Sequence, residues 1–195
     1  MREFILFSRI GQTDSNFGSL HDAGRLDIMH ECIVSSLFLS HSLRRDVVFH
    51  AILNGPPNPP VHIKIDGQTL YDVRTNMETW QGIIKKTLAS KLQTPSQQLH
   101  PGINKDKSSF EALLKSKAEA GNCKIYVLEE RGRELSEIEF EENSVFVLGD
   151  HVGMPRKAEL FALRFGEKVS LGKTPYLAAS CITVINYMLD QKVKV

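Results

Sequence analysis

A loop bounded by two glycines follows an apolar run late in the chain, and its residue types suit ligand binding. The run from Ser144 to Leu148 predicts a buried strand, and Gly149-Asp-His-Val-Gly153 follows it directly. Gly149 allows a sharp turn, Gly153 allows the backbone to approach a ligand closely, and Asp150 could accept a hydrogen bond from a ribose hydroxyl or an amine. The spacing lacks the G-x-G-x-x-G fingerprint of dinucleotide-binding proteins, so a plain strand-exit loop is an equally good interpretation.

A second loop, Leu171-Gly-Lys-Thr-Pro-Tyr176, follows a short predicted strand and precedes the long apolar helix that closes the sequence. Thr174 and Pro175 fit the N-cap and the first position of that helix. The free amide groups and the dipole at such a helix start would suit a carboxylate ligand. Because loops at the carboxyl ends of neighbouring strands form ligand crevices in α/β sheets, the two loops together predict a binding site.

Cys181 lies within the last helix, and the pattern alone predicts a small core side chain there. No histidine is close to it in the sequence to act as a base, so a nucleophilic cysteine is not supported. The other two cysteines, Cys32 and Cys123, are far apart, and no pair has CxxC spacing. A zinc site or a disulfide framework is therefore not expected, and we predict no bound metal.

Two adjacent arginines, Arg44 and Arg45, come near the end of a helix that the sequence predicts from about Arg25 to Ser42. Cations suit the carboxyl end of a helix, where they interact favourably with its dipole. Beside a cleft, the same pair could instead bind phosphate. The pattern alone favours the first interpretation.

Apolar runs and helical periodicities alternate along the chain. This alternation predicts an α/β fold with a mainly parallel sheet and helices on both of its faces. We see no long linker, so we predict a single domain over residues 1–195. The segment 93–107 is polar and contains two prolines, and it predicts a loop. The strands are predicted at 4–7, 47–53, 61–65, 123–128 and 144–148, with a further short strand before residue 171.

The net charge of +1 is lower than that of a typical general polyanion binder. Any contact with a nucleic acid must therefore come from a local patch or from the symmetry of a dimer. The amino-terminal residues become polar too soon for a signal peptide, and no apolar run reaches the roughly 18 residues that span a bilayer. These features and the unpaired cysteines predict a cytoplasmic protein that does not bind membranes.

Four segments together resemble one known family. They are Ala23-Gly-Arg-Leu-Asp27, Ser40-His-Ser-Leu-Arg-Arg-Asp46, Gly55-Pro-Pro-Asn-Pro-Pro60 and Val145-Phe-Val-Leu-Gly-Asp-His-Val-Gly153. They look like the SPOUT-class tRNA pseudouridine N1-methyltransferases of the TrmY family. The resemblance extends from Phe4 to about Asp190. The proline-rich block and the Arg-Arg-Asp block are specific in combination, whereas the Gly-Asp-His-x-Gly loop is common to a wider class.

The resemblance implies a SPOUT fold with a trefoil knot in its carboxyl-terminal part, a homodimer, and S-adenosylmethionine as the methyl donor. By position, the donor is expected at the end of the strand near Leu128, in the loop at Gly149, and in the loop that precedes the last helix. The implied donor-binding residues are Leu128, Gly149, Leu171, Gly172, Thr174, Tyr176 and Cys181.

The implied reaction is methylation of N1 of a pseudouridine in RNA, with the T-loop of tRNA as the family's target. Arg25 and Asp27 are our candidates for positioning the target and handling its proton, although a simple ion pair at a helix end is an equally good interpretation. RNA phosphates would contact cationic side chains, which a dimer would double. The candidates for this role are Arg9, Arg44, Arg45 and Lys64.

Two alternatives stay open. The same chemistry could act on another RNA, such as ribosomal RNA, or on a uridine rather than a pseudouridine. The chain could also be an RNA-binding dimer that keeps the fold without catalysis. A nucleotide-dependent oxidoreductase is disfavoured because the glycine fingerprint is missing.

Overall fold

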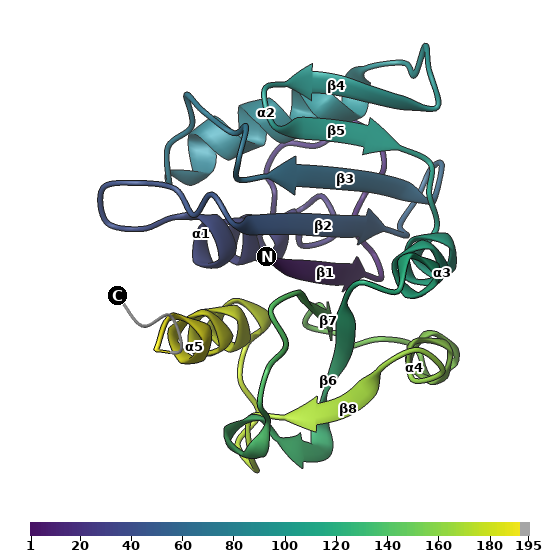
Figure 1. The fold of residues 1–195 in the computed structure, drawn as a ribbon. Coiled ribbons are helices and arrows are strands. Elements are labelled where there is room, and N and C mark those ends of the chain that lie inside the picture. The colour runs from purple at the N-terminus through teal and green to yellow at the C-terminus, as the bar shows by residue number, and fades with distance from the viewer. Residues whose placement is uncertain (192–195) are drawn as a thin grey trace.

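The apolar runs of the sequence form one eight-stranded sheet in the computed structural model, which describes residues 1–191 (Figure 1). The strands are β1 (Arg2–Ser8), β2 (Val47–Leu53), β3 (Val61–Asp66), β4 (Ser96–His100), β5 (Ile103–Asp106), β6 (Lys124–Glu134), β7 (Ser144–Gly149) and β8 (Glu167–Ser170). The helices are α1 (Leu26–Leu37), α2 (Met77–Ala89), α3 (Phe110–Ala120), α4 (Arg156–Ala162) and α5 (Ala178–Asp190), and η1 (Leu135–Glu137) is a short 3-10 helix. The predicted domain extends to residue 195, so its last four residues lie outside the described part.

The sheet has a parallel part and an antiparallel part. Its strand order is β4-β5-β3-β2-β1-β7-β6-β8. The strands from β2 to β8 in this order run parallel, whereas β3, β5 and β4 pair antiparallel beyond β2. Four of the seven neighbouring pairs within residues 1–191 are therefore parallel, and the predicted mainly parallel α/β sheet is confirmed.

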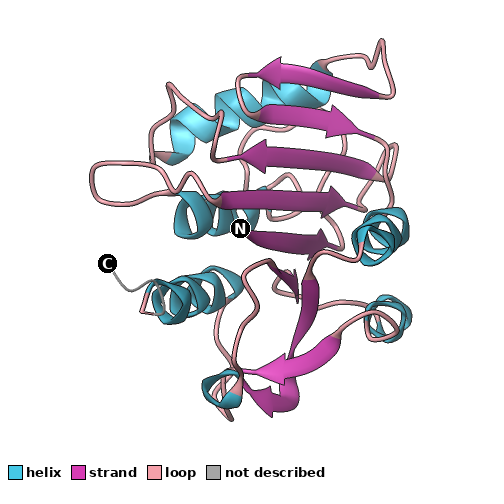
Figure 2. Cartoon of the chain, in the orientation of Figure 1, coloured by secondary structure: helices cyan, strands magenta, loops and turns pink. Residues whose placement is uncertain are grey.

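Helices cover both faces of the sheet, as predicted (Figure 2). One face packs against α1, α2 and α5, and its core contains Phe4, Phe49 and Phe146 with Trp80 and Ile185. The opposite face packs against α3 and α4. Because both faces of β1, β2 and β7 are covered, these strands are almost continuously apolar rather than alternating. Within residues 1–191, no helix is long and apolar enough to span a membrane.

Three local predictions were wrong. The segment 93–107 contains β4 and β5, which form an antiparallel hairpin against β3 instead of a loop. Helix α1 ends at Leu37, so Arg44 and Arg45 belong to the connection that leads into β2. Helix α5 begins at Ala178, so Thr174 and Pro175 precede it by one helical turn instead of capping it. The first error missed two edge strands and the other two misplaced a helix boundary; in each case tertiary packing rather than local sequence decides the structure.

A buried row of ionisable side chains crosses four strands on the face that α3 covers. His50 Nε2 lies 2.8 Å from Glu3 Oε2, His50 Nδ1 lies 2.9 Å from His62 Nε2, and His62 Nδ1 lies 3.0 Å from Asp106 Oδ2. Lys117 of α3 also pairs with Glu3. Burial lowers the pKa of His50 to about 4. Burial alone would raise the pKa of Glu3 and of Asp106, but their hydrogen bonds overcome it and hold both at about 2.

We expect this row to make stability fall as the pH is lowered from 7. An unfolded His50 binds its proton near pH 6.5 and the folded one near pH 4, so the unfolded state takes up more protons between these values. The depressed pKa values of Glu3 and Asp106 act in the same direction at lower pH. Urea unfolding at pH 7 and pH 4.5 should differ by on the order of 2 kcal/mol because of His50. His50→Gln should remove most of this difference, and an unchanged difference would contradict the assignment.

Candidate active site

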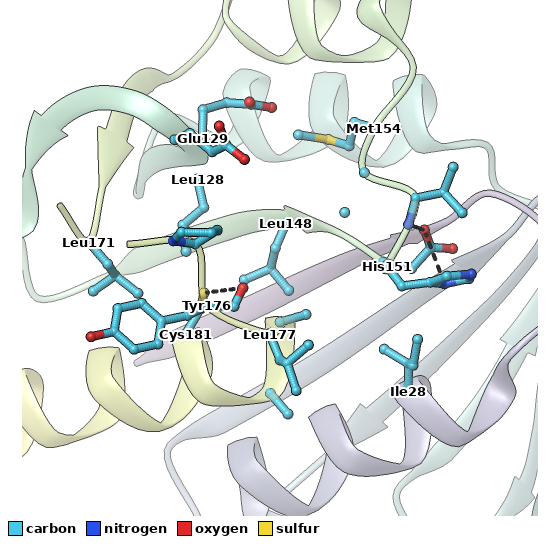
Figure 3. Close-up of a pocket in the computed structure, with 18 of the residues that line it drawn as sticks. Ile28, Leu128, Glu129, Leu148, His151, Met154, Leu171, Tyr176, Leu177 and Cys181 are labelled. Atoms are coloured by element: carbon cyan, nitrogen blue, oxygen red, sulfur yellow. Dashed lines mark hydrogen bonds and ion pairs between the residues drawn. The ribbon is translucent and has the colours of Figure 1, made fainter. Parts of the chain in front are cut away.

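A cavity of about 580 Å³ opens at the carboxyl edge of the parallel strands (Figure 3). It lies beside the ends of β6, β7 and β8, and the start of α5 forms part of its wall. Its size is in the usual range of small-molecule sites, and so is its position in an α/β sheet. The apolar part of its wall includes Ile28, Leu128, Leu148, Met154, Leu171, Leu177 and Ala178.

The loop after β7 depends on Gly149 and Asp150. A Cβ atom on Gly149 would lie 2.6 Å from the amide nitrogen of Met154, so only glycine allows the loop to fold back this tightly. Asp150 is buried and its carboxylate accepts hydrogen bonds from the amides of Arg9 (2.8 Å) and Val152 (2.9 Å). Asp150 therefore joins the loops that follow β1 and β7, which is a structural use of the group that the sequence offered as a ribose acceptor.

The segment after β8 forms the opposite wall. Gly172 has a φ of 100°, and its amide donates to the hydroxyl of Ser170 over 2.9 Å. The chain then passes Thr174 and Tyr176 along the cavity before α5 begins. Burial raises the pKa of Cys181, so its thiol stays protonated and serves as a wall rather than as a nucleophile.

The structure brings the residues of the predicted donor site together. The cavity is lined by every one of them: Leu128, Gly149, Leu171, Gly172, Thr174, Tyr176 and Cys181. They come from three segments that are far apart in the sequence. A shared location for all seven is what a single ligand would require.

Arg25 also lines the cavity, whereas Asp27 is not one of the lining residues and binds the guanidinium group of Arg25. The Arg25 Nε and Nη2 atoms donate to the Asp27 carboxylate at 3.0 to 3.2 Å. Arg25 has a φ of 64°, a left-handed conformation that costs energy for a residue with a side chain. Burial alone would raise the pKa of Asp27, but hydrogen bonds and the charge of Arg25 lower it, so the carboxylate is ionised.

The cavity contains acidic residues that the sequence did not single out. Glu129 and Glu130 follow Leu128 on its wall, and Glu31 projects from α1. Burial raises the pKa of Glu129, and the charge of the nearby Glu159 adds to this. Their location depends on a break in the pairing of β6 with β8 after Leu128, which no local pattern predicts. Among residues 1–191, no group of three His, Cys, Asp or Glu side chains is arranged to hold a metal ion.

The four predicted RNA-binding cations have different surroundings in the structure. Arg9 is exposed just after β1, near the cavity loop that contains Asp150. Lys64 lies on β3, where its nearest acidic partner is Asp66 at 3.4 Å. The guanidinium group of Arg44 is bound by Asp190, and that of Arg45 donates to the carbonyl groups of Gly67 and Leu70.

Comparison with known proteins shows which protein family the chain belongs to. A family described as "Putative SAM-dependent RNA methyltransferase" matches residues 1–193. The chain belongs to this methyltransferase family. Curated relatives named tRNA (pseudouridine(54)-N(1))-methyltransferase are similar in sequence to this chain over nearly its full length. The protein of Methanocella arvoryzae is 36% identical over 98% of this chain and 100% of its own, and that of Methanocaldococcus jannaschii is 37% identical over 98% of each chain.

Solved methyltransferases share the fold at low sequence identity. Nep1 of Archaeoglobus fulgidus, bound to S-adenosylhomocysteine, aligns with a TM-score of 0.66 at 14% identity, covering 97% of this chain and 96% of its own. The SpoU methyltransferase AviRb of Streptomyces viridochromogenes, in complex with AdoMet, aligns with a TM-score of 0.50 at 13% identity, covering 98% of this chain and 58% of its own. These likenesses concern the mixed α/β fold of the methyltransferase family.

Proposed function

We propose that this chain is an enzyme that transfers the methyl group of S-adenosylmethionine to N1 of a pseudouridine in tRNA. The observation that carries the proposal is the cavity in which the seven implied donor-binding residues meet. Family membership and full-length relatives of the same named activity support the reaction and its RNA target.

The residues of the cavity fit an S-adenosylmethionine molecule. Leu128, Leu148 and Leu171 offer apolar surface for the adenine ring, and the backbone around Gly149 and Gly172 offers polar groups without side chains in the way. The carboxylates of Glu129 and Glu130 suit a ligand that carries ammonium and sulfonium charges. When bound, the donor supplies an activated methyl group, so the protein mainly has to orient the target and exclude water.

We propose that Arg25 positions the target nucleotide and that Asp27 keeps Arg25 in place. The strained backbone of Arg25, its position on the cavity wall and its contact with Asp27 support this role. Proton handling, the other role predicted for Asp27, fits less well because its pKa is lowered and a lowered pKa makes a weaker base.

Among the predicted RNA contacts, Arg9 and Lys64 remain our proposal for binding phosphates. Both are accessible, and Arg9 lies beside the loop that forms the cavity. Arg44 and Arg45 are engaged within the protein, so a phosphate would have to compete with Asp190 and with backbone carbonyl groups.

The affinity for tRNA, measured at increasing salt concentration, tests this assignment. The affinity should fall less steeply with salt after Arg9→Gln than in the wild type, whereas Arg45→Gln should leave the slope unchanged.

We also propose a trefoil knot in the carboxyl-terminal part of a single domain. β8 lies at the edge of the sheet beyond β6, yet the helix that follows it packs on α1, on the far side of β7. The connection from β8 to α5 passes along the cavity at the ends of β6 and β7. Leu135 and Ile138, in the connection from β6 to β7, pack into the same core as α5. Knots are rare, so a direct test is needed. Pulled from both ends, a knotted chain stays shorter than roughly 3.3 to 3.6 Å per residue, and full extension would exclude it.

A homodimer is our proposal for the exposed apolar side chains around α5. Tyr176, Leu177 and Tyr187 are 52%, 70% and 63% exposed, which is high for large apolar side chains. A second copy bound there would cover them and the open side of the cavity. Tyr187→Glu should then give a monomer in sedimentation experiments, and a monomeric wild type would contradict the proposal.

We propose a cytoplasmic location because the three cysteines are free thiols.

The reaction is tested by incubating the protein with S-adenosylmethionine and tRNA that carries pseudouridine, followed by nucleoside mass spectrometry. We expect N1-methylpseudouridine in tRNA and none in tRNA that carries uridine at the same position. Methylation of ribosomal RNA alone would replace the proposed target and keep the chemistry. Binding of tRNA without any methylation and without affinity for S-adenosylhomocysteine would favour the non-catalytic RNA-binding dimer.

A further inference from the structure

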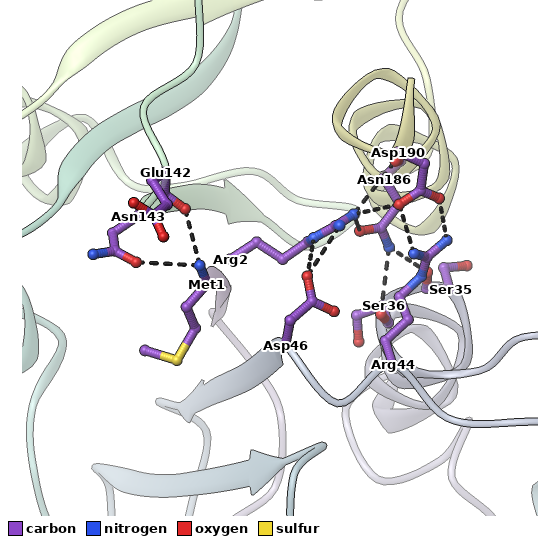
Figure 4. Close-up of polar contacts among 10 residues, drawn as sticks. All are labelled: Met1, Arg2, Ser35, Ser36, Arg44, Asp46, Glu142, Asn143, Asn186 and Asp190. Atoms are coloured by element: carbon purple, nitrogen blue, oxygen red, sulfur yellow. Dashed lines mark hydrogen bonds and ion pairs between the residues drawn. The ribbon is translucent and has the colours of Figure 1, made fainter. Parts of the chain in front are cut away.

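The last turn of α5 is fixed to the start of β1 by a cluster of charged and polar side chains (Figure 4). Asp190 receives two hydrogen bonds from Arg44, at 2.8 and 2.6 Å, and one from Arg2 at 2.9 Å. Arg2 also pairs with Asp46, in the connection before β2, at 3.0 Å. One carboxylate of α5 therefore joins two segments that are distant in sequence from it.

A buried asparagine completes this attachment. Asn186 is 2% exposed and lies one turn before Asp190. Its amide group donates to the carbonyl oxygens of Ser35 and Ser36, in the last turn of α1, and its side-chain oxygen accepts from Arg2 at 3.0 Å. The final carbonyl groups of a helix have no partner within that helix, so Asn186 satisfies two of them while it holds α5 against α1.

Asp190 compensates the positive charges of Arg2 and Arg44 in this cluster. The side chains of Arg2 and Arg44 are only 9% and 13% exposed, so neither cation is well solvated. Arg2 keeps Asp46 if Asp190 is lost, but Asp190 is the carboxylate that pairs with Arg44 among residues 1–191. The Nε atom of Arg44 already has no hydrogen-bond partner in this part of the chain. Removing the carboxylate would leave a nearly buried cation uncompensated, which is costly.

The opposite end of the same helix forms the cavity wall. Leu177, Ala178 and Cys181 line the cavity, and Asp190 lies about 14 Å beyond Cys181 along the helix, at roughly 1.5 Å per residue. A straight helix transmits a tilt at one end to the other, because its own hydrogen bonds keep it rigid. Between the two ends, Ile182 and Ile185 are fully buried and act as the point of support.

We propose that Asp190 is a positioning residue of the donor site, which acts through α5 on the wall that contains Cys181. This inference rests on the proposed function, because it assumes that the cavity binds S-adenosylmethionine. It predicts that a change at Asp190 weakens donor binding more than it weakens tRNA binding, although the residue touches neither.

The test compares Asp190→Asn with Asp46→Asn in the full chain. Both remove a carboxylate partner of Arg2, but only Asp190 belongs to α5. S-adenosylhomocysteine is the probe, and its affinity is measured by calorimetry well below the melting temperature of each variant. We expect about tenfold weaker binding for Asp190→Asn, and for Asp46→Asn a change of less than about twofold. The affinity for tRNA should change by less than about twofold in both.

Amide hydrogen exchange provides a readout that does not need a ligand. Residues 174–181 should exchange faster in Asp190→Asn than in Asp46→Asn, because the wall is less firmly held. If Asp190→Asn melts earlier but keeps wild-type affinity and wild-type exchange at 174–181, its role is only structural and the inference is wrong. If Asp190→Asn does not fold, Arg44→Gln gives the same test, because it removes one partner of Asp190 and leaves Arg2 in place.

The two proposals can fail separately. A wild-type protein that does not bind S-adenosylhomocysteine would contradict the proposed function, and the exchange comparison would still decide whether Asp190 positions the wall. A wild-type protein that binds the probe while both variants bind it equally well would contradict only the role of Asp190.

Discussion

Arg25→Gly is expected to lower kcat for tRNA methylation by about 100-fold while leaving the fold intact. Arg25 lines the cavity, and the substitution removes the side chain that we propose to position the target. Glycine is the informative replacement because Arg25 has a φ of 64°, which glycine adopts without strain. The relief of backbone strain should offset the loss of the ion pair with Asp27, so thermal stability should change little.

Two further variants separate the roles of Arg25 and Asp27. Arg25→Lys keeps the charge but cannot reproduce the paired contacts of a guanidinium group, so it should also be impaired. Asp27→Asn should reduce kcat by a smaller factor and leave its pH profile unchanged if Asp27 only orients Arg25. A pH profile that loses its acidic limb in Asp27→Asn would instead identify Asp27 as the proton acceptor. Wild-type kcat in Arg25→Gly would remove Arg25 from the site.

Cys181→Trp is expected to weaken the binding of S-adenosylhomocysteine by on the order of 100-fold. The thiol lies on the wall of the cavity, and an indole ring at this position would fill space that the adenosyl group needs. Because Cys181 is not one of the fully buried core residues, the larger side chain should be tolerated by the fold. Calorimetry gives the affinity, and circular dichroism and thermal melting check the structure.

Cys181→Ala is the matched control for this substitution. It removes the thiol without adding volume, so it should bind the probe within about threefold of the wild type. Strong loss in both variants would give the thiol itself a role in binding. Wild-type affinity in Cys181→Trp would mean that the donor binds elsewhere, and the cavity would lose its proposed function.

The strands that are buried on both faces could be predicted because they consist of nearly continuous apolar residues. The apolar runs of β1, β2 and β7 have few alternatives to a central strand, and the structure confirms them. The hairpin of β4 and β5 lies at the edge of the sheet, where exposed polar side chains are tolerated, and only Ile103 and Lys105 are buried in these strands. Its pairing with β3 is a tertiary contact, so the local pattern of 93–107 indicated a loop.

Some parts of the candidate site could be predicted from local sequence patterns, whereas others could not. The loop at Gly149 could be found because a glycine follows a buried strand. The seven residues that we expect to bind the donor were named only from the resemblance to a family. Thr174 and Pro175 satisfy the local rules for a helix start, yet α5, which packs against α1, begins only at Ala178. Glu129 and Asp190 escaped notice because their roles depend on partners far away in the sequence.

The order in which the chain leaves the ribosome has a consequence for the cavity. Its wall combines Arg25 with residues 128–130, 148–154 and 170–181, and β1 gains its neighbour β7 only when residues 144–149 are present. A nascent chain in which α5 has not yet emerged thus lacks one wall of the proposed donor site. Chains truncated before α5 are therefore expected to lack the cavity wall around Cys181 and to be inactive.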